Sequence, residues 1–259
     1  MSVEFDLKGQ VAIVTGGGKG VGRGITTRFL EAGADVVICG RSELEAPIEA
    51  GGRTAHFRQA DVRDVEQVAA VVDYAKQELG RLDVLVNNAG GAPEADAATV
   101  SPRFSEAILR LNLIAPLNFA QAANAVMQSQ VEGGCIINIS SVSGVRPSPG
   151  TAAYGAAKAG LLSLTTTLAV EWAPKVRVNA VTAGMIRTEQ SHLHYGDEDG
   201  IAAVGATVPL GRIGEPEDVG DACLYLASSL SRYMSGANLL LHGGGEKPAF
   251  LSAAKNTSD

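Results

Sequence analysis

The sequence predicts an α/β fold: one domain built on a doubly wound parallel sheet of about seven strands, with helices on both faces. Short apolar runs alternate with longer amphipathic stretches along the chain of 259 residues. Several runs are continuous and rich in β-branched residues, as strands buried on both faces are. Strands and helices in alternation give parallel pairing through right-handed crossovers. Since no linker, charge block or internal repeat interrupts this pattern, we expect a single domain over residues 1–259.

Seven apolar runs are predicted to be strands, and Val11 to Thr15 is the first of them. The others are residues 35–39, 54–59, 82–87, 135–140, 176–181 and 238–241. Periodic apolar residues predict helices at 21–32, 64–79, 103–130, 152–173 and 216–229. Two stretches with few periodic residues, 92–102 and 188–212, are predicted to be irregular. We expect 247–259 to be a tail that is mobile or packs on a partner subunit.

Composition and charge limit the classes of function. Hydrophobic residues make up 46% of the chain, and the net charge is -7 without a basic run. This balance disfavours binding to nucleic acids or to anionic membranes. No apolar stretch approaches the roughly 18 residues needed to cross a bilayer, and the polar, acidic first residues do not resemble a secretory signal. The three cysteines, Cys39, Cys135 and Cys223, lie far apart in apolar segments, so we expect buried free thiols in a reducing cytoplasm.

A glycine-rich segment, Thr15-Gly-Gly-Gly-Lys-Gly-Val-Gly22, follows the first predicted strand. Glycines allow a sharp turn and a close approach to a ligand, and the start of the next helix presents free N–H groups. After a buried first strand, this loop indicates a pyrophosphate site. A P-loop is excluded because Lys19 is not followed by Ser or Thr. The candidate contacts are Gly16, Gly18, Lys19, Gly20, Val21 and Gly22.

The end of the second predicted strand bears on the choice of cofactor. Dinucleotide folds that prefer NAD usually place an acidic residue there, to bind the ribose 2′-hydroxyl. This chain has Gly40 and then Arg41, with Lys19 nearby in the glycine loop. A charge-assisted hydrogen bond to a 2′-phosphate contributes roughly 1.5–3 kcal/mol. We therefore predict a preference for NADP(H) over NAD(H), unless Arg41 is only a solvated loop residue.

Tyr154 and Lys158 stand four residues apart in a predicted helix, so their side chains share one face. A phenol with an ordinary pKa of about 10 transfers protons poorly at neutral pH. A neighbouring ammonium favours the phenolate, so we expect the pKa of Tyr154 to be lowered. Such a pair in isolation is usually an exposed Tyr beside a solvated Lys, and only the other motifs give it significance.

Together these motifs resemble the short-chain dehydrogenase/reductase family, including its 3-oxoacyl-reductase-like members, over about residues 5–246. The resemblance implies a Rossmann-like fold and an NAD(P)-dependent oxidoreductase that interconverts a ketone and a secondary alcohol. It also implies a homotetramer, with a dimer as the next choice. The motifs are Thr15 to Gly22, Asp61-Val62, Asn87-Asn-Ala-Gly90, Asn112, Ile139-Ser-Ser141, Tyr154-x-x-x-Lys158 and Asn179-Ala-Val181.

The resemblance also implies a role for each matching residue. Tyr154 would donate the proton, and Ser141 would hydrogen-bond to the same carbonyl oxygen. Lys158 would hold the nicotinamide ribose, and Asn112 would hold a water in a proton relay. The remaining positions would contact the cofactor: Asp61 and Val62 beside the adenine, Asn88, Ala89 and Gly90 along the nucleotide cleft, and Ile186 and Thr188 near the nicotinamide carboxamide and the phosphates.

The substrate is expected over the nicotinamide, bounded by 91–93, 145–149, Met185 and the region 188–212. Apolar residues in these segments (Val145, Met185, Leu193 and Tyr195) favour an apolar or acyl-type ketone, while Arg146 and Arg187 are candidates for binding a phosphate or carboxylate. The Ala- and Leu-rich helices 103–130 and 152–173 favour a subunit contact.

The chain departs from the family pattern in places that do not include the proposed chemical residues. Ala183-Gly184 replaces a common Pro-Gly, 173–177 is one residue shorter, and Leu241-His-Gly-Gly244 replaces Val-Asp-Gly-Gly. His192 and His194 have no third ligand at suitable spacing, so no metal site is predicted. Two other classes of function stay open, a non-redox lyase or isomerase on the same scaffold and a nucleotide-sensing binding protein.

Overall fold

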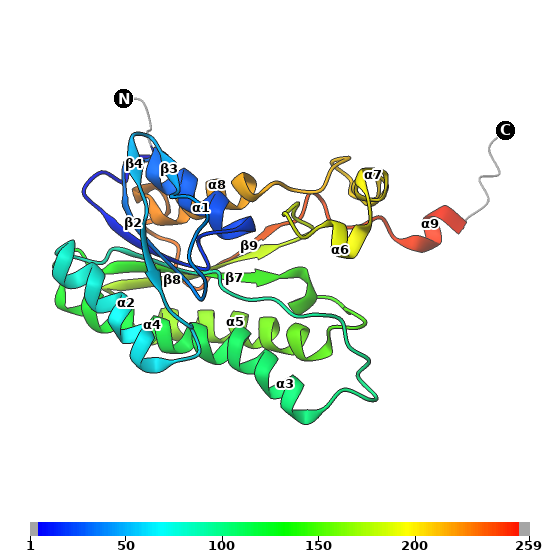
Figure 1. Ribbon diagram of the computed structural model, residues 1–259, viewed down its shortest axis with the longest axis horizontal. Coiled ribbons are helices and arrows are strands. Elements are labelled where there is room, and N and C mark those ends of the chain that lie inside the picture. Colours follow the sequence, from blue (N-terminus) through cyan, green and yellow to red (C-terminus); the bar gives the residue numbers. More distant parts are fainter. Residues whose placement is uncertain (1–4, 254–259) are drawn as a thin grey trace.

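The central sheet of the computed structural model, which describes residues 5–253, confirms the predicted fold class. Seven parallel strands lie in the order β5-β2-β1-β6-β7-β8-β9 within one α/β domain (Figure 1). The strand order changes direction between β1 and β6, which makes the sheet doubly wound. The strands are β1 (Val11–Thr15), β2 (Asp35–Gly40), β5 (His56–Gln59), β6 (Val84–Asn87), β7 (Gly134–Ser141), β8 (Val176–Ala183) and β9 (Asn238–Leu241).

Helices cover both faces of the sheet (Figure 1). On one face lie α1 (Gly20–Glu31) and α8 (Pro216–Ala227), and on the other lie α2 (Val65–Glu78), α4 (Ala115–Ser129) and α5 (Ala152–Glu171). Alternate residues of β1 enter different cores. Val11 and Ile13 pack with the α2, α4 and α5 side, whereas Ala12 and Val14 pack with the α1 and α8 side. This double burial explains the unbroken apolar run of the first strand.

The predicted helix over 103–130 is interrupted. It consists of α3 (Pro102–Leu109), the π-helical segment η1 (Arg110–Ile114) and α4. The amide of Ala115 donates to the carbonyl of Arg110, five residues earlier, which marks the wider turn. A π-bulge of this kind is frequent at functional sites. Apolar spacing cannot reveal one extra residue in a turn, and the segment carries Asn112.

The prediction that 188–212 is irregular is wrong. The region contains α6 (His192–Tyr195) and α7 (Glu198–Thr207). The carboxylate of Asp197 caps α7 by accepting from the amide of Gly200. Acidic residues at 198 and 199 then occupy the first helical turn, where they interact favourably with the helix dipole. Capping and charge stabilise this helix, and apolar periodicity does not detect either effect.

The predicted strand 54–59 is divided into β4 (Arg53–Thr54) and β5. β4 pairs antiparallel with β3 (Glu49–Ala50) in a hairpin that the sequence prediction missed. Gly51 and Gly52 connect the two strands with φ of 57° and 72°, values that glycine adopts readily. A Gly-Gly pair between short strands is a recognised hairpin signal, so this turn could have been anticipated.

The expected irregular stretch 92–102 is confirmed up to Ser101, since α3 begins at Pro102. The expected tail is ordered in part: α9 (Ala249–Ala253) projects from the body of the molecule (Figure 1). Residues 254–259 of that predicted tail lie outside the described residues. Two single turns, η2 (Val142–Gly144) and η3 (Ser229–Ser231), complete the helical elements of the described chain.

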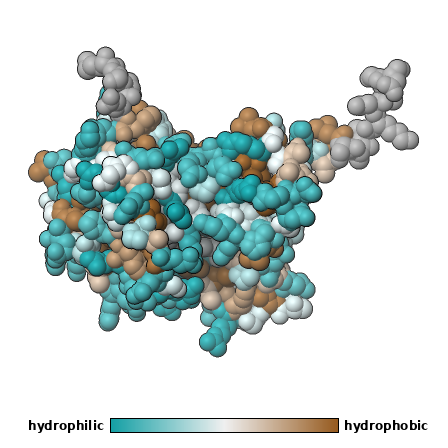
Figure 2. Space-filling model, turned by 45° about the horizontal axis from the view of Figure 1, so that its top comes forward, coloured by the Kyte–Doolittle hydropathy of each residue, from teal (hydrophilic) through white to brown (hydrophobic). Residues whose placement is uncertain are grey.

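The exposed face is polar and the cysteines are buried, as expected from the charge and the positions of the cysteines. The face seen in Figure 2 is mostly hydrophilic, with apolar residues in scattered groups. Of the helices described between residues 5 and 253, none combines the length and the apolar character that a membrane span requires. The three cysteines are buried and free, as predicted.

Candidate active site

The candidate site lies at the carboxyl ends of the strands, where α6 and α7 sit in Figure 1. Its first part is the glycine loop between β1 and α1. Gly16 and Gly20 adopt φ of 64° and 47°, in the left-handed region that favours glycine. At Gly22 an added Cβ would stand 2.2 Å from the carbonyl oxygen of Gly16. The loop is therefore curved so tightly that residue 22 has no room for a side chain, which fits a cradle for a pyrophosphate.

The end of β6 is tied directly to this loop. The hydroxyl of Thr15 accepts hydrogen bonds from the amides of Asn88 and Ala89, each at 2.9 Å. The amide side chain of Asn88 donates to the Thr15 carbonyl at 2.9 Å. The predicted cleft residues thus lie beside the glycine loop. The side chain of Asn88 holds the loop in shape, because its donor is directed to the loop backbone.

The outer end of the candidate nucleotide cleft carries Arg41, Asp61 and Val62. Arg41 is exposed after β2, Asp61 follows β5, and Val62 is buried beside it. The guanidinium of Arg63 binds the Asp61 carboxylate in a bidentate pair and, with a smaller contribution from Arg41, lowers the pKa of Asp61 to about 2. Arg63 was missed by the sequence prediction, because an arginine two residues after a motif acid is no motif in itself.

Ser141, Tyr154 and Lys158 come together at the end of β7 and the first two turns of α5. Ser141 is the last residue of β7, and its hydroxyl lies close enough to the Tyr154 phenol to affect the pKa of that phenol. The Lys158 ammonium lies 5.6 Å from the centre of the Tyr154 ring and donates to the carbonyl of Ile139 at 2.8 Å. At Gly155 an added Cβ would lie 2.7 Å from the Ser143 carbonyl oxygen, so glycine allows α5 to approach η2 this closely.

The expected lowering of the Tyr154 pKa is not found in the structure. Burial raises the pKa of Tyr154, and the Ser141 hydroxyl opposes this effect only in part. Lys158 is itself almost completely buried, and desolvation lowers its pKa to about 8. An ammonium in water keeps its full charge, but this one is desolvated. Burial penalises the charged forms of both side chains, so the phenol stays protonated and the ammonium is only weakly retained.

The buried Lys158 predicts a pH dependence of stability. Its pKa is about 8 in the folded protein, against 10.5 for the free side chain. Between these values the unfolded chain binds more protons, so the free energy of unfolding rises with pH. The gain attributable to Lys158 should reach up to about 3 kcal/mol, at about 1.4 kcal/mol per pKa unit. Urea unfolding from pH 8 to 10 should show this rise in the wild type and its loss in Lys158→Met.

The matched control for that measurement is Lys76→Met, which removes an exposed lysine of α2. This variant should keep the wild-type dependence on pH. If Lys158→Met kept it as well, the ammonium of Lys158 would have to be solvated in the folded protein.

Asn112 is fully buried in η1, and its side-chain amide hydrogen-bonds to backbone groups. Its Oδ1 accepts from the amide of Gly91 at 2.8 Å, while its Nδ2 donates to the carbonyls of Gly91 and Ile108, each at 3.0 Å. An added Cβ at Gly90 would lie 2.6 Å from Asn112 Oδ1 and 3.3 Å from Lys158 Nζ. Asn112 therefore positions the 90–91 turn next to the Lys158 ammonium. Its suggested part in a water relay stays a prediction.

The segment after β8 returns to the glycine loop. Ile186 pairs with Gly214 in an isolated bridge, and the methyl group of Thr188 lies 3.1 Å from where a Cβ on Gly20 would be. Both predicted residues thus border the candidate cofactor cleft, Thr188 at its phosphate end.

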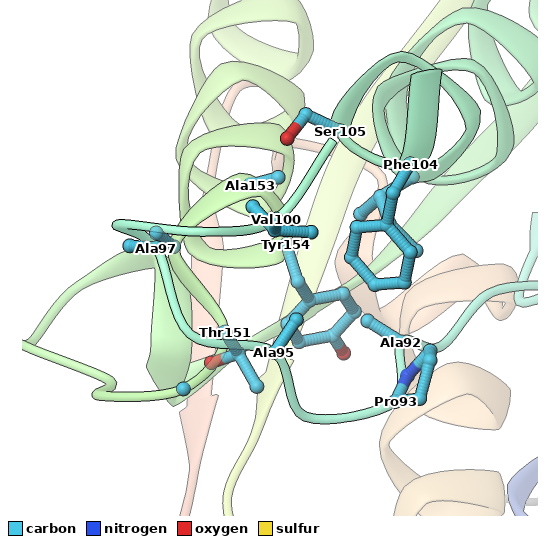
Figure 3. Close-up of a pocket in the computed structure, with 13 residues that line it drawn as sticks. Ala92, Pro93, Ala95, Ala97, Val100, Phe104, Ser105, Thr151, Ala153 and Tyr154 are labelled. Atoms are coloured by element: carbon cyan, nitrogen blue, oxygen red, sulfur yellow. The ribbon is translucent and has the colours of Figure 1, made fainter. Parts of the chain in front are cut away.

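A cavity of about 90 Å³ lies against the Tyr154 ring. Figure 3 shows the ring among Ala92, Ala95 and Phe104, so the wall of this cavity is mostly apolar, with Ser105 and Thr151 as its hydroxyl residues. Ala92 and Pro93 were predicted to border the substrate. Phe104 and Ile108 of α3 were not, because core-like apolar residues on a helix carry no sequence signal for a pocket.

A second cavity, of about 230 Å³, lies at the ends of β7, β8 and β9. Val145, Arg146 and Met185 line it as expected, together with unpredicted residues that include His242 and Glu246. Arg146 is paired with Glu246, however, and Arg187 is paired with Glu198 at 2.8 Å. Neither arginine presents an uncompensated charge to a substrate, which weakens the case for an anionic one.

His192 and His194 both belong to α6 and are exposed. In the described part of the chain, residues 5–253, no three His, Cys, Asp or Glu side chains are grouped so that they could hold a metal ion.

Comparison with known proteins covers nearly the whole chain. The sequence model of a family described as enoyl-(acyl carrier protein) reductase matches residues 16–246. The chain is 37% identical over 246 residues to the 3alpha-hydroxysteroid dehydrogenase of Mediterraneibacter gnavus, which covers 92% of this chain and 97% of that protein. It is 35% identical over 244 residues to the 3-oxoacyl-(acyl-carrier-protein) reductase of Thermotoga maritima, with 92% and 98% covered.

Among solved structures, a short-chain type dehydrogenase/reductase from Mycobacterium marinum is similar, with a TM-score of 0.85 and 34% identity. The alignment covers 94% of this chain and 98% of that one. The similarity therefore includes the strand ends at which Ser141, Tyr154 and Lys158 meet.

Proposed function

This chain belongs to the short-chain dehydrogenase/reductase family, and from that premise we propose that it reduces an apolar ketone with NADPH. The family's enzymes are oxidoreductases that act on CH–OH or C=O groups with nicotinamide cofactors, and this chain is one of them. The observation that carries the finer proposal is the meeting of Ser141, Tyr154 and Lys158 beside an apolar cavity.

The residues present fit a dinucleotide. The loop closes tightly at Gly16 and Gly22, as a pyrophosphate-binding turn does, and Thr188 stands next to it. At the outer end, Arg41 and the Asp61–Arg63 pair would border the adenosine. A bound nicotinamide supplies or accepts the hydride, and the protein provides position and proton transfer.

Tyr154 is the proposed proton donor to the ketone oxygen. Because burial raises its pKa, the phenol is protonated at neutral pH, which is the state that reduction requires. The Ser141 hydroxyl lies near that phenol, so both hydroxyls can point at one carbonyl oxygen and stabilise the negative charge that develops there. A preference for NADPH would support reduction as the cellular direction.

Lys158 and Asn112 are the proposed auxiliary residues of the proton donor Tyr154. With a pKa of about 8, the Lys158 amine exchanges protons readily near neutral pH, and we propose that it restores the proton of Tyr154. We also propose that Lys158 holds the nicotinamide ribose. Asn112 acts as a positioning residue, since it fixes the 90–91 turn that separates it from Lys158.

Charge at the adenosine end supports NADP(H) over NAD(H). Arg41 is exposed and no acidic residue takes its place at the end of β2. Lys19, which precedes α1, adds a second cation to the same strand edge. Asp61 is neutralised by Arg63 and so would repel a 2′-phosphate only weakly.

The pocket supports a neutral, largely apolar substrate. Its walls near Tyr154 are mostly apolar. Arg146, which lines the second cavity, and Arg187 already have carboxylate partners. One similar protein is described as a 3alpha-hydroxysteroid dehydrogenase, which makes cyclic ketones the first class to test.

The test is a panel of ketones and secondary alcohols, followed by NADPH and NADH absorbance in parallel. We expect reduction of apolar cyclic or acyl ketones, with kcat/KM for NADPH at least about tenfold above that for NADH, as one charge-assisted hydrogen bond allows. In Arg41→Ala the NADPH value should fall by about ten- to a hundredfold while the NADH value stays unchanged. A clear NADH preference in the wild type would refute the cofactor proposal.

The control for the arginine is Arg232→Ala, which also removes an exposed charge. Arg232 follows η3, which contacts β8, and three strands separate β8 from β2. Its kinetics with both nucleotides should match the wild type. A loss of NADPH activity in both arginine variants would mean that net charge, not a 2′-phosphate contact, sets the preference.

We further propose a cytoplasmic homo-oligomer, with a tetramer as first choice and a dimer as second. Three buried, reduced cysteines support a reducing compartment. Outward-facing apolar residues on α5, with Val170 80% exposed, support a helix-on-helix subunit contact.

A further inference from the structure

A carboxylate of this chain occupies the start of α1. Both oxygens of Glu189 accept from the amide of Gly20, at 3.3 Å and 3.1 Å. Gly20 is the first residue of a helix of 12 residues, where unpaired N–H groups and the helix dipole attract anions. In the proposed function, the amide of Gly20 would face the pyrophosphate of the dinucleotide. Glu189 therefore sits where the anionic part of a dinucleotide would bind.

A compact turn holds Glu189 in this place. The amide of Thr188 donates to the Ser191 hydroxyl at 2.8 Å, and the amide of Ser191 donates to the Thr188 carbonyl at 3.0 Å. The Nδ1 of His192 lies 2.9 Å from the carbonyl oxygen of Glu189. Thr188 packs on Gly20 from the same turn. The carboxylate is thus presented to the helix by a structured segment and not by a loose loop.

We propose that Glu189 is an internal competitor for the phosphate end of the cofactor site, which a dinucleotide must displace in order to bind. The inference rests on the proposed function. A pyrophosphate and a carboxylate cannot share the amide of Gly20, and their like charges repel each other at this distance. Displacement sets the affinity for both nicotinamide dinucleotides equally, since NAD(H) and NADP(H) have the same pyrophosphate.

The turn that carries Glu189 also adjoins the second cavity. The turn that carries Glu189 leads directly into α6, which ends at Tyr195. Tyr195 lies close enough to Arg146 and Glu246, at the second cavity, for both to affect its pKa. A backbone shift of 188–195 on cofactor binding would therefore be transmitted to the second cavity, whereas rotation of the exposed Glu189 side chain alone would not.

The experiment compares apo wild type with Glu189→Gln, Glu189→Ala and the control Asp199→Asn. Asp199 is an exposed acid on α7, so the control removes the same charge from the same region without touching α1. Calorimetric titration with NADPH, NADH and inorganic pyrophosphate should give dissociation constants about two- to fivefold lower for both Glu189 variants, as expected for one carboxylate at a helix start. Asp199→Asn should match the wild type.

A second readout separates competition from a structural role. Loss of the carboxylate should lower the apo Tm, because the start of α1 loses its partner, and should enlarge the rise in Tm on saturation with NADPH. A purely structural contact would move apo and saturated values together. Dissociation constants equal to the wild type, or the same gain in Asp199→Asn, would overturn the inference and leave the proposed function standing. Failure of all four proteins to bind either nucleotide would overturn both.

Discussion

Replacing Tyr154 with phenylalanine should lower kcat by about a thousandfold or more and leave the dissociation constant for the cofactor within about twofold of the wild type. The change removes only the phenolic hydroxyl, so the ring keeps its place against Ala92, Ala95 and Phe104 (Figure 3). Ser141 alone could still hydrogen-bond to the ketone oxygen, but its hydroxyl is a far weaker acid. Single-turnover kinetics with the best ketone, together with NADPH titration, measures the two quantities separately.

The matched control is Tyr225→Phe, which removes a phenolic hydroxyl on α8 that contacts Met234. Its kcat should equal that of the wild type. Should Tyr154→Phe keep more than a tenth of the activity while Tyr225→Phe is normal, another group must supply the proton, and the assignment of Tyr154 would be wrong.

Replacing Gly22 with alanine should weaken cofactor binding by about a hundredfold or more. The new Cβ would lie 2.2 Å from the Gly16 carbonyl oxygen and 2.6 Å from Asn88 Nδ2, where real Cβ contacts below 3.0 Å essentially never occur. The carbonyl belongs to the backbone of the cradle, so relief of the clash must open the loop and move its N–H groups. Overpacking of this kind also costs about 1–3 kcal/mol of stability. Calorimetric titration and thermal unfolding measure both effects.

Gly24→Ala separates the loss of cofactor binding from the loss of stability, because its added Cβ creates a steric clash in α1 but outside the glycine loop. Its Cβ would lie 2.4 Å from the carbonyl carbon of Pro216, at the contact between α1 and α8. This variant should lose comparable stability yet bind cofactor within a few-fold of the wild type. If both variants lost cofactor affinity equally, general loosening of α1, and not the cradle at Gly16, would be the cause.

Much of the fold could be predicted from local pattern. The run from Val11 to Thr15 is buried on both faces. Each of its side chains therefore had to be apolar or to find a hydrogen-bond partner inside the protein, as the Thr15 hydroxyl does. The same constraint revealed the other buried strands. It failed for α7, which is stabilised by the Asp197 cap, and for the π-helical turn at Asn112, where one residue is added without changing the apolar spacing.

The candidate site could be located but its electrostatics could not. The spacing of Tyr154 and Lys158 in a helix predicts that they share a face, and they do. The direction of the Tyr154 pKa shift was predicted wrongly, because burial depends on how α5 packs on the sheet. The partners of Arg146 and Arg187 were equally unpredictable, since Glu246 and Glu198 reach them only through the fold.

The sequence by itself determined the main alternation of strands and helices, the glycine cradle and the one-turn spacing of the phenol and the amine. These features depend on residues that are near one another along the chain, where periodicity and backbone freedom act directly. Only the tertiary structure decided which charges are solvated, which arginines are neutralised, and that Glu189 reaches the start of a helix 169 residues earlier. Desolvation and Coulomb interactions depend on distances in space, and for residues far apart along the chain these distances are set only when the protein folds.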